Sequence, residues 1–119
     1  MISKIFFVGF GGALGAVSRF GINEFLEKYL NNSTSYSVLL VNILGCFLIG
    51  LIIGTSMPEK NTTYYFFIIG FLGSFTTMSA LTYQTIMIAN TNLIHALSYI
   101  MFTVVITIAA TYIGTTIAR

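Results

Sequence analysis

The chain has 119 residues, of which 56% are hydrophobic and 7% are charged, and its formal net charge is +2. These values describe a small integral membrane protein and leave no room for a separate soluble domain. Because the few basic residues form no cluster, we expect no nucleic-acid-binding surface and no polybasic lipid-binding surface.

Apolar runs long enough to cross the ~30 Å hydrocarbon core of a bilayer occur four times, and we expect each to form a membrane-spanning helix. Short polar connections separate them, and the only proline, Pro58, stands where the second helix should stop. We therefore expect an all-α integral membrane protein with one transmembrane domain, 1–119, and helices at about 4–26, 37–57, 64–89 and 93–117.

An even number of spans places both termini on one side of the membrane. Lys4, Lys60 and Arg119 then oppose Lys28, so the positive-inside rule favours cytoplasmic termini. The charge bias is slight enough to permit dual or reversed insertion.

Small residues recur at intervals of four in the first two spans, as Gly11 with Gly15 and Gly50 with Gly54. This spacing allows close backbone approach between membrane helices, either within one subunit or between subunits. Four helices of this length enclose little by themselves. A polar path through them implies a partner subunit, with the path at or near the interface.

Two polar side chains inside the first two spans need partners. Arg19 either extends to the membrane interface or anchors a structural network that also raises the local potential for anions. Asn42 either forms an interhelical hydrogen bond or donates its amide to an anion. The lone Cys46 has no partner for an internal disulfide, and we expect it to pack as a small hydrophobe.

The third span carries two glycines and five hydroxyl side chains between Gly70 and Thr82. Hydrocarbon satisfies no backbone or hydroxyl group, so protein, trapped water or an ion must do so. We expect Gly70, Gly73 and the pair Thr76-Thr77 to break this helix and to free carbonyl groups that can coordinate a cation. Permeation is the interpretation that best explains these groups.

In the fourth span Tyr99, Thr103, Thr107 and Thr111 recur at intervals of four, which places their hydroxyls along one face of a helix. These hydroxyls either line a polar path or bond back to carbonyls of their own helix. His95, the only histidine, is expected at the membrane interface near the start of this helix.

Three separated motifs resemble the Fluc (CrcB) family of fluoride channels and occur in the same order. The resemblance implies an antiparallel dual-topology dimer of four-helix subunits with a broken third helix, in the plasma (inner) membrane of a bacterial cell. It also implies passive fluoride export that reduces toxicity, and a structural Na⁺ ion that is not transported. The motifs are residues 11–20, 39–50 and 70–79.

The same resemblance assigns roles to single residues. Gly73 and Thr76 match the carbonyls that coordinate sodium, and Arg19 matches a structural arginine of the first helix. A pore selective for fluoride must replace its hydration water with hydrogen-bond donors and positive aromatic edges. The expected pore-lining residues are Asn42, Met78, Ser79, Leu81, Thr82, Tyr99 and Thr103.

The sequence departs from the family pattern at the expected pore. Met78 and Leu81 stand where the family has two phenylalanines, Gln84 replaces an acidic residue and Val38 replaces a threonine. This pattern favours a heterodimer in which a homologous sister subunit supplies the missing phenylalanines. A homodimer that conducts with Met and Leu is the second possibility.

Other classes of membrane protein fit the sequence less well. A small four-helix multidrug-type transporter needs a carboxylate inside the membrane, whereas Glu24, Glu27 and Glu59 stand at helix ends or in loops. An enzyme is not expected, because no cluster of His, Asp and Glu provides a general base or metal ligands. A structural subunit that does not conduct remains an alternative.

Overall fold

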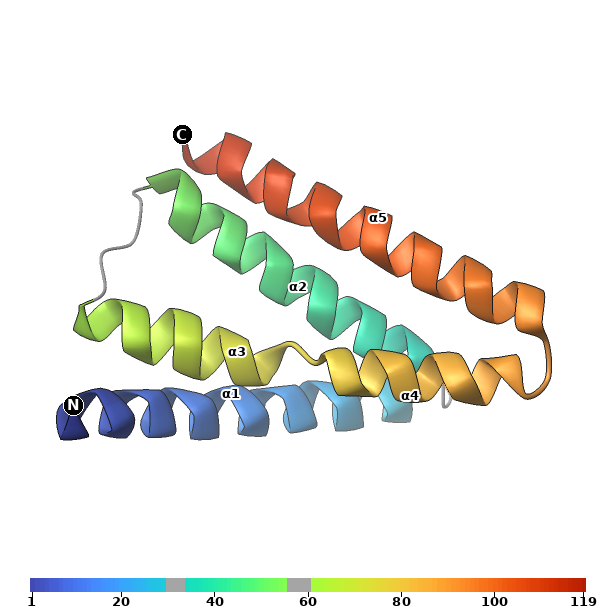
Figure 1. Ribbon diagram of the computed structural model, residues 1–119, viewed down its shortest axis with the longest axis horizontal. Coiled ribbons are helices and arrows are strands. Elements are labelled where there is room, and N and C mark those ends of the chain that lie inside the picture. The colour runs from blue at the N-terminus through green and yellow to red at the C-terminus, as the bar shows by residue number, and fades with distance from the viewer. Residues whose placement is uncertain (30–33, 56–60) are drawn as a thin grey trace.

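A computed structural model describes residues 1–29, 34–55 and 61–119, and this part of the chain is all-helical (Figure 1). Four stretches are long and apolar enough to span a membrane: Ile2–Tyr29, Tyr36–Thr55, Tyr64–Ala89 and Leu93–Ala118. This confirms the four spans expected from the sequence. The elements are α1 (Ile2–Tyr29), α2 (Thr34–Thr55), η1 (Tyr64–Leu72), α3 (Gly73–Phe75), α4 (Met78–Ala89) and α5 (Leu93–Ala118).

The first helix is longer than the sequence suggests. α1 continues to Tyr29, past the expected end near residue 26. The rings of Phe25 and Tyr29, one turn apart, lie 4.6 Å from each other, and Lys28 places a positive charge at the negative end of the helix dipole. Both contacts favour another helical turn in a segment that polarity alone assigns to a loop. Pro58 and the expected end of the second helix lie outside the described residues.

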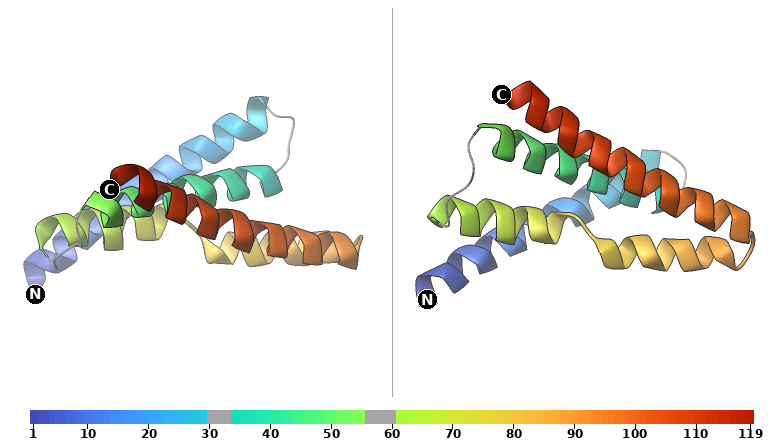
Figure 2. Two further views of the ribbon diagram at one scale, coloured as in Figure 1. Left: turned by 90° about the horizontal axis from the view of Figure 1, so that it is seen from above. Right: turned by 45° about the horizontal axis from the view of Figure 1, so that its top comes forward.

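The helices form two tightly packed pairs, α1 with η1 and α2 with α5 (Figures 1 and 2). In the first pair, a Cβ atom added at Gly11 or Gly15 would overlap the backbone carbonyl of Phe66 or Phe71. The close approach predicted from the glycine spacing is therefore packing within one chain.

The second pair is built in the same way. A Cβ atom at Gly50 would overlap the carbonyl oxygen of Thr111, and one at Gly54 would lie 2.6 Å from that of Thr115. Gly114 makes the reciprocal contact from α5, because a Cβ atom there would lie 2.5 Å from the carbonyl oxygen of Phe47. Two backbones thus lie in direct contact where the end of α2 meets the end of α5.

The third span changes partners at its middle. Its first half, η1 and α3, packs on α1, whereas α4 packs on α5 (Figures 1 and 2). η1 is a π-helix, with wider turns than an α-helix, and sequence patterns did not predict it. Gly70 of η1 is buried against α1, where an added Cβ atom would lie 2.7 Å from the Val8 carbonyl oxygen.

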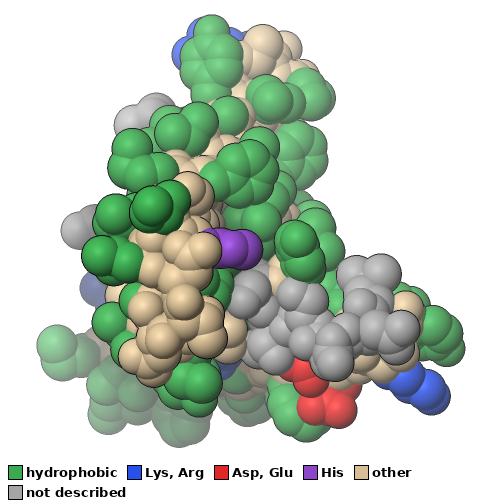
Figure 3. All heavy atoms as spheres, turned by 90° about the vertical axis from the view of Figure 1, so that its right-hand side faces the viewer, with side chains coloured by type: hydrophobic (Ala, Val, Ile, Leu, Met, Phe, Trp, Pro, Cys, Tyr) green, Lys and Arg blue, Asp and Glu red, His purple; other side chains and the backbone are tan. Residues whose placement is uncertain are grey.

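Figure 3 views the helices end-on, from the side where α4 joins α5, and shows hydrophobic side chains around its margins. Along the spans many large apolar side chains are exposed, among them Phe20, Ile86 and Ile108, as expected for a surface in contact with lipid. The buried side chains lie where α2 meets α5 and the third span. They include Val38, Val41, Phe75 and Leu81. The core is therefore centred beside the break in the third span.

Candidate functional site at the break in the third span

Thr76 and Thr77 interrupt the third span with extended backbone between α3 and α4. Their φ and ψ angles are −82° and 155° for Thr76, and −149° and 115° for Thr77. The Thr76 hydroxyl donates to the Leu72 carbonyl at 3.0 Å, while the Ala80 N–H donates to the Thr77 hydroxyl at 3.1 Å. Each threonine therefore satisfies one of the two helix ends created by the break.

Asn42 of α2 holds the break from the side. Its Oδ1 accepts from the Thr77 N–H at 2.8 Å, and its Nδ2 donates to the Thr77 carbonyl at 3.2 Å. Asn42 is only 7% exposed, so these bonds satisfy backbone groups that have little access to water. The interhelical hydrogen bond anticipated for Asn42 is present. An amide carries two N–H donors, so Thr77 uses only one of them.

This arrangement removes the usual helical donors from the two carbonyls that the family resemblance assigns to a cation. In a continuous α-helix the Thr77 N–H would donate to the Gly73 carbonyl, but here it donates to Asn42. The Ala80 N–H would likewise donate to the Thr76 carbonyl, but here it donates to the Thr77 hydroxyl. The side chains of Asn42 and Thr77 thus accept from the two N–H groups that would otherwise donate to the carbonyls of Gly73 and Thr76. Gly73 is also exposed on the surface of the chain.

A cation at this point would need such carbonyl ligands. Within the described residues there is no group of three or more His, Cys, Asp and Glu side chains that could hold a metal ion. Backbone carbonyls of an interrupted membrane helix are oxygen ligands suited to Na⁺. The donor set therefore fits a hard monovalent cation better than a transition metal.

A cavity of about 340 Å³ opens beside the break, between α2, α4 and α5. Five of the expected pore or sodium residues line it, together with Thr77 of the expected break and Thr107 of the expected hydroxyl face. Cys46, expected only to pack as a small hydrophobe, also lines it, and Val104 is the lining residue that the sequence did not single out. The lining residues are Asn42, Cys46, Thr76, Thr77, Met78, Leu81, Thr103, Val104 and Thr107.

The threonines of α5 form two kinds of hydrogen bond. Thr103 and Thr107 donate to carbonyls of their own helix, at Tyr99 (2.8 Å) and Thr103 (2.7 Å). Thr111 instead donates across to the Cys46 carbonyl of α2 at 3.0 Å. The back-bonding interpretation therefore holds for the two threonines at the cavity. Their hydroxyl protons must rotate away from a helix carbonyl before they can bind an anion.

Met78 and Leu81 lie in different surroundings although both line the cavity. Leu81 is 4% exposed and part of the core, whereas Met78 is 70% exposed. Ser79 and Thr82 are exposed and do not line this cavity; the Thr82 hydroxyl donates to the Ser79 carbonyl at 3.0 Å. This outer side of α4 is the part of the expected pore that a single chain leaves open.

Tyr99 and Arg19 lie outside this cavity. Tyr99 is half-buried and lines a second cavity nearer the start of α5. Arg19 is half-buried on α1, and its Nε is buried without a hydrogen-bond partner in the described part of the chain, as is Oδ1 of Asn23 one turn later.

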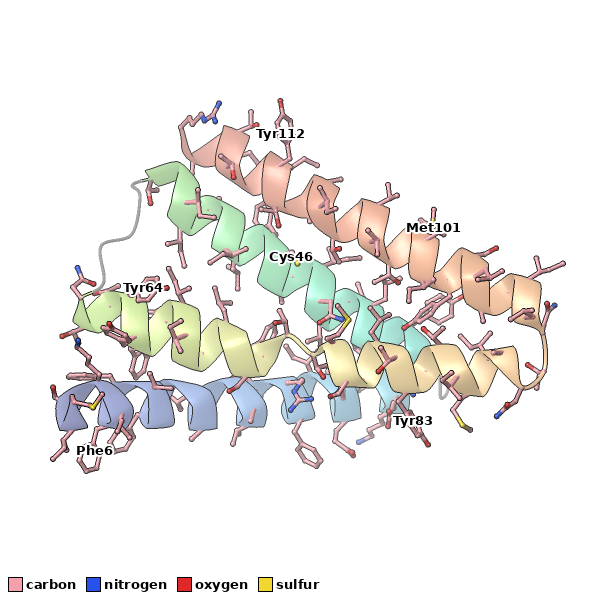
Figure 4. All side chains as sticks on the ribbon, in the orientation of Figure 1. Phe6, Cys46, Tyr64, Tyr83, Met101 and Tyr112 are labelled. Atoms are coloured by element: carbon pink, nitrogen blue, oxygen red, sulfur yellow. The ribbon has the colours of Figure 1, made fainter. Side chains whose placement is uncertain are left out.

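Figure 4 shows Cys46 in the middle of α2 and shows Met101 and Tyr112 on the side of α5 that faces away from α2.

Comparisons with known proteins agree with this architecture. A family model described as CrcB-like protein, Camphor Resistance (CrcB), matches residues 6–115. Three similar proteins are each named Fluoride-specific ion channel FluC. The protein of Dehalococcoides mccartyi is 38% identical over 117 residues, which is 95% of this chain and 90% of the relative. That of Flavobacterium psychrophilum is 34% identical over 122 residues (99% and 98%), and that of Azobacteroides pseudotrichonymphae is 32% identical over 118 residues (96% and 94%).

Proposed function

Because the chain belongs to the CrcB-like family, we propose that it is a subunit of a fluoride-selective channel in the bacterial plasma membrane and that it lets fluoride leave the cytoplasm passively. It is a multi-pass membrane protein and not an enzyme. The observation that carries the proposal is the cavity beside the broken third span, where an amide and several hydroxyls meet inside an otherwise apolar protein.

Those groups suit a small, strongly hydrated anion. Fluoride crosses a membrane only where donors replace its hydration shell. Asn42 keeps one amide N–H beyond those bonded to Thr77, and the hydroxyls of Thr103 and Thr107 can turn from their helix carbonyls toward a passing ion. Exchange between a carbonyl and an anion costs little net hydrogen bonding, so binding and release can both be fast.

The second part of the proposal is that the channel is an antiparallel dimer, with a homologous sister subunit favoured over a second copy. Gly73 and Met78 are exposed at the break, and a partner packed there would cover both. Met78 and Leu81 offer no aromatic edge to fluoride. A sister subunit with phenylalanine at the equivalent positions would supply those edges.

The third part is a structural Na⁺ between the two breaks. Gly73 and Thr76 would contribute carbonyls whose usual helical donors are directed elsewhere. Each subunit would provide half of the ligands, so the binding site for the ion would be complete only in the dimer. Bound there, Na⁺ would join the two broken helices and add positive potential near the anion path.

Fluoride efflux from liposomes tests the function. Vesicles loaded with potassium fluoride would contain the chain alone, or the chain co-expressed with a sister subunit, and chloride would be the selectivity control. Selective efflux that occurs only when the sister subunit is present supports the heterodimer. Selective efflux from the chain alone supports the homodimer. Absence of efflux in both preparations, with protein that is folded and dimeric, would contradict the channel and favour a structural subunit.

A further inference from the structure

A second cavity of about 630 Å³ lies between α2, α4 and α5, closer to the turn that joins α4 to α5. Tyr99 lines it, and Thr103, one turn along α5, lines the first cavity. The two cavities therefore follow one another along the same face of α5. The second is lined by Tyr36, Leu39, Ile88, Thr91, His95, Ser98, Tyr99 and Phe102.

His95 is the one described residue lining this cavity whose side chain can carry a positive charge. It is exposed in the first turn of α5, where its backbone N–H donates to Oδ1 of Asn92 at 3.1 Å. This capping bond fixes the position of the residue and leaves the ring out of the contact. An imidazole ring is neutral with one N–H and cationic when both nitrogens carry a proton, and the cationic ring attracts anions.

Among the described residues that line the cavity, none besides His95 is an acid or a base. α4 contributes Ile88 and the turn after it contributes Thr91, while α2 and α5 contribute Tyr36 and Tyr99. Tyrosine hydroxyls ordinarily ionise only near pH 10. Glu24, Glu27 and Lys28 of α1 line a separate hollow. Figure 3 shows the histidine on this face apart from the acidic side chains.

We propose that His95 is an entry residue for fluoride, and that its protonated ring concentrates the anion in this cavity before it passes Tyr99. The proposal rests on the proposed channel function and adds a regulation that depends on pH. A single positive charge some 7–10 Å from an anion in a largely aqueous cavity raises the local anion concentration about two- to fivefold. We therefore expect entry to be faster at the lower pH, where more of the rings carry the second proton.

The flux experiment compares initial fluoride efflux at pH 5.5 and pH 7.5, using whichever assembly conducts. Hydrogen fluoride crosses bilayers unaided, so protein-free vesicles are measured at each pH and subtracted. We expect about threefold faster efflux at pH 5.5 for the unmodified chain. His95→Gln should be slow at both values and His95→Lys fast at both. The proposal would be overturned if His95→Gln kept the same ratio of efflux at pH 5.5 to efflux at pH 7.5 as the unmodified chain.

A matched control moves the imidazole out of the cavity. Ile94 is 76% exposed and does not line the cavity, so the double variant Ile94→His/His95→Gln carries the same charge next to the original position. Because only the ring at position 95 faces the cavity, this variant should behave like His95→Gln. Recovery of the pH ratio would show that a general surface charge is sufficient and would overturn an entry role for His95.

A binding measurement separates failure of this inference from failure of the channel function. The chain has one histidine, so its ring gives a single titrating NMR resonance in nanodiscs. An anion that binds the cationic ring should move the midpoint upward by about 0.3–0.5 pH unit in 100 mM fluoride compared with isethionate at equal ionic strength. An unchanged midpoint overturns the proposal even if fluoride flux is observed. A shifted midpoint without flux supports the entry site and contradicts the channel.

Discussion

The two halves of the third span are held to the rest of the protein by different forces. η1 is held by backbone contact, because Gly11, Gly15 and Gly70 let it lie directly against α1. The break that leads into α4 is held by side-chain hydrogen bonds from Asn42 and Thr77. One half therefore depends on the absence of side chains and the other on particular polar atoms. The first provides a rigid scaffold, and the second provides the chemistry.

The largest expected effect is loss of the glycine contact. Gly11→Val places a side chain onto the Phe66 backbone, which cannot move without unpacking η1. We expect more than about 3 kcal/mol of destabilisation and little recoverable folded protein. Size-exclusion chromatography after heating in detergent measures the fraction of protein that stays folded. Gly9→Val is the control, because nothing lies within 4 Å of a Cβ atom there. Equal recovery of the two variants would contradict the scaffold role of this contact.

Asn42→Leu should have the next largest effect, because it leaves the partly buried N–H and carbonyl of Thr77 without the Asn42 partner. The expected loss is about 1–3 kcal/mol, together with loss of fluoride flux. Thermal unfolding in detergent and liposome efflux measure the two losses. In the control Asn23→Leu, the amide oxygen that is removed is buried without a partner, so stability should be unchanged or higher. Wild-type flux from Asn42→Leu would show that the clamp is not needed for conduction.

A smaller effect is expected for the threonines of α5. Thr111→Val removes a bond between helices and should cost about 0.5–1.5 kcal/mol. Thr107→Val removes only bonds to its own helix, at the carbonyls of Thr103 and Val104, so the melting temperature should be nearly unchanged. Differential scanning fluorimetry of both variants is sufficient to compare them. A larger loss for Thr107→Val would mean that the back-bonded hydroxyl supports packing as well.

The smallest effect on stability is expected for Met78→Phe, because this side chain is exposed in the single chain. Leu81→Phe is the matched change in the core and should cost about 1–3 kcal/mol through overpacking. If the missing aromatic edges limit conduction by the chain alone, Met78→Phe should also increase its fluoride efflux. Efflux that is unchanged while the protein is folded would assign the limitation to another position.

The sequence predicted the parts of the fold that depend on composition and spacing. Apolar length gave the four spans, and glycine intervals indicated close backbone contacts in the first two spans but not the helices they would meet. Thr76 and Thr77 form the expected break, whereas Gly70 and Gly73, which were expected to belong to it, are helical. The sequence did not predict which acceptor each hydroxyl uses, because Thr103 and Thr111 look alike in a pattern and differ only in what lies opposite. The π-helix was missed because apolar length and glycine spacing do not distinguish its wider turns from those of an α-helix.

The sequence predicted which residues form the candidate site better than it predicted the hydrogen bonds between them. Asn42, Thr76 and Thr103 were all singled out from the sequence, and the structure places them around one cavity. That Asn42 bonds both polar backbone groups of Thr77 depends on residues 35 positions apart, which no local pattern can show. His95 was placed correctly at the start of the last helix, but the cavity beside it is a property of three helices together.

A substitution at Gly73 would be hard for cellular quality control to detect. The Gly73 backbone is ordinary helix, and an added Cβ atom would meet only the Ile68 carbonyl oxygen at 3.7 Å. A Gly73→Ala chain should therefore be synthesised, inserted and folded like the normal one. In the proposed dimer the same methyl group would stand at the sodium ligands, where the subunits meet. Cellular quality control acting on single chains would pass such a protein, and the defect would appear only as fluoride sensitivity of the whole cell.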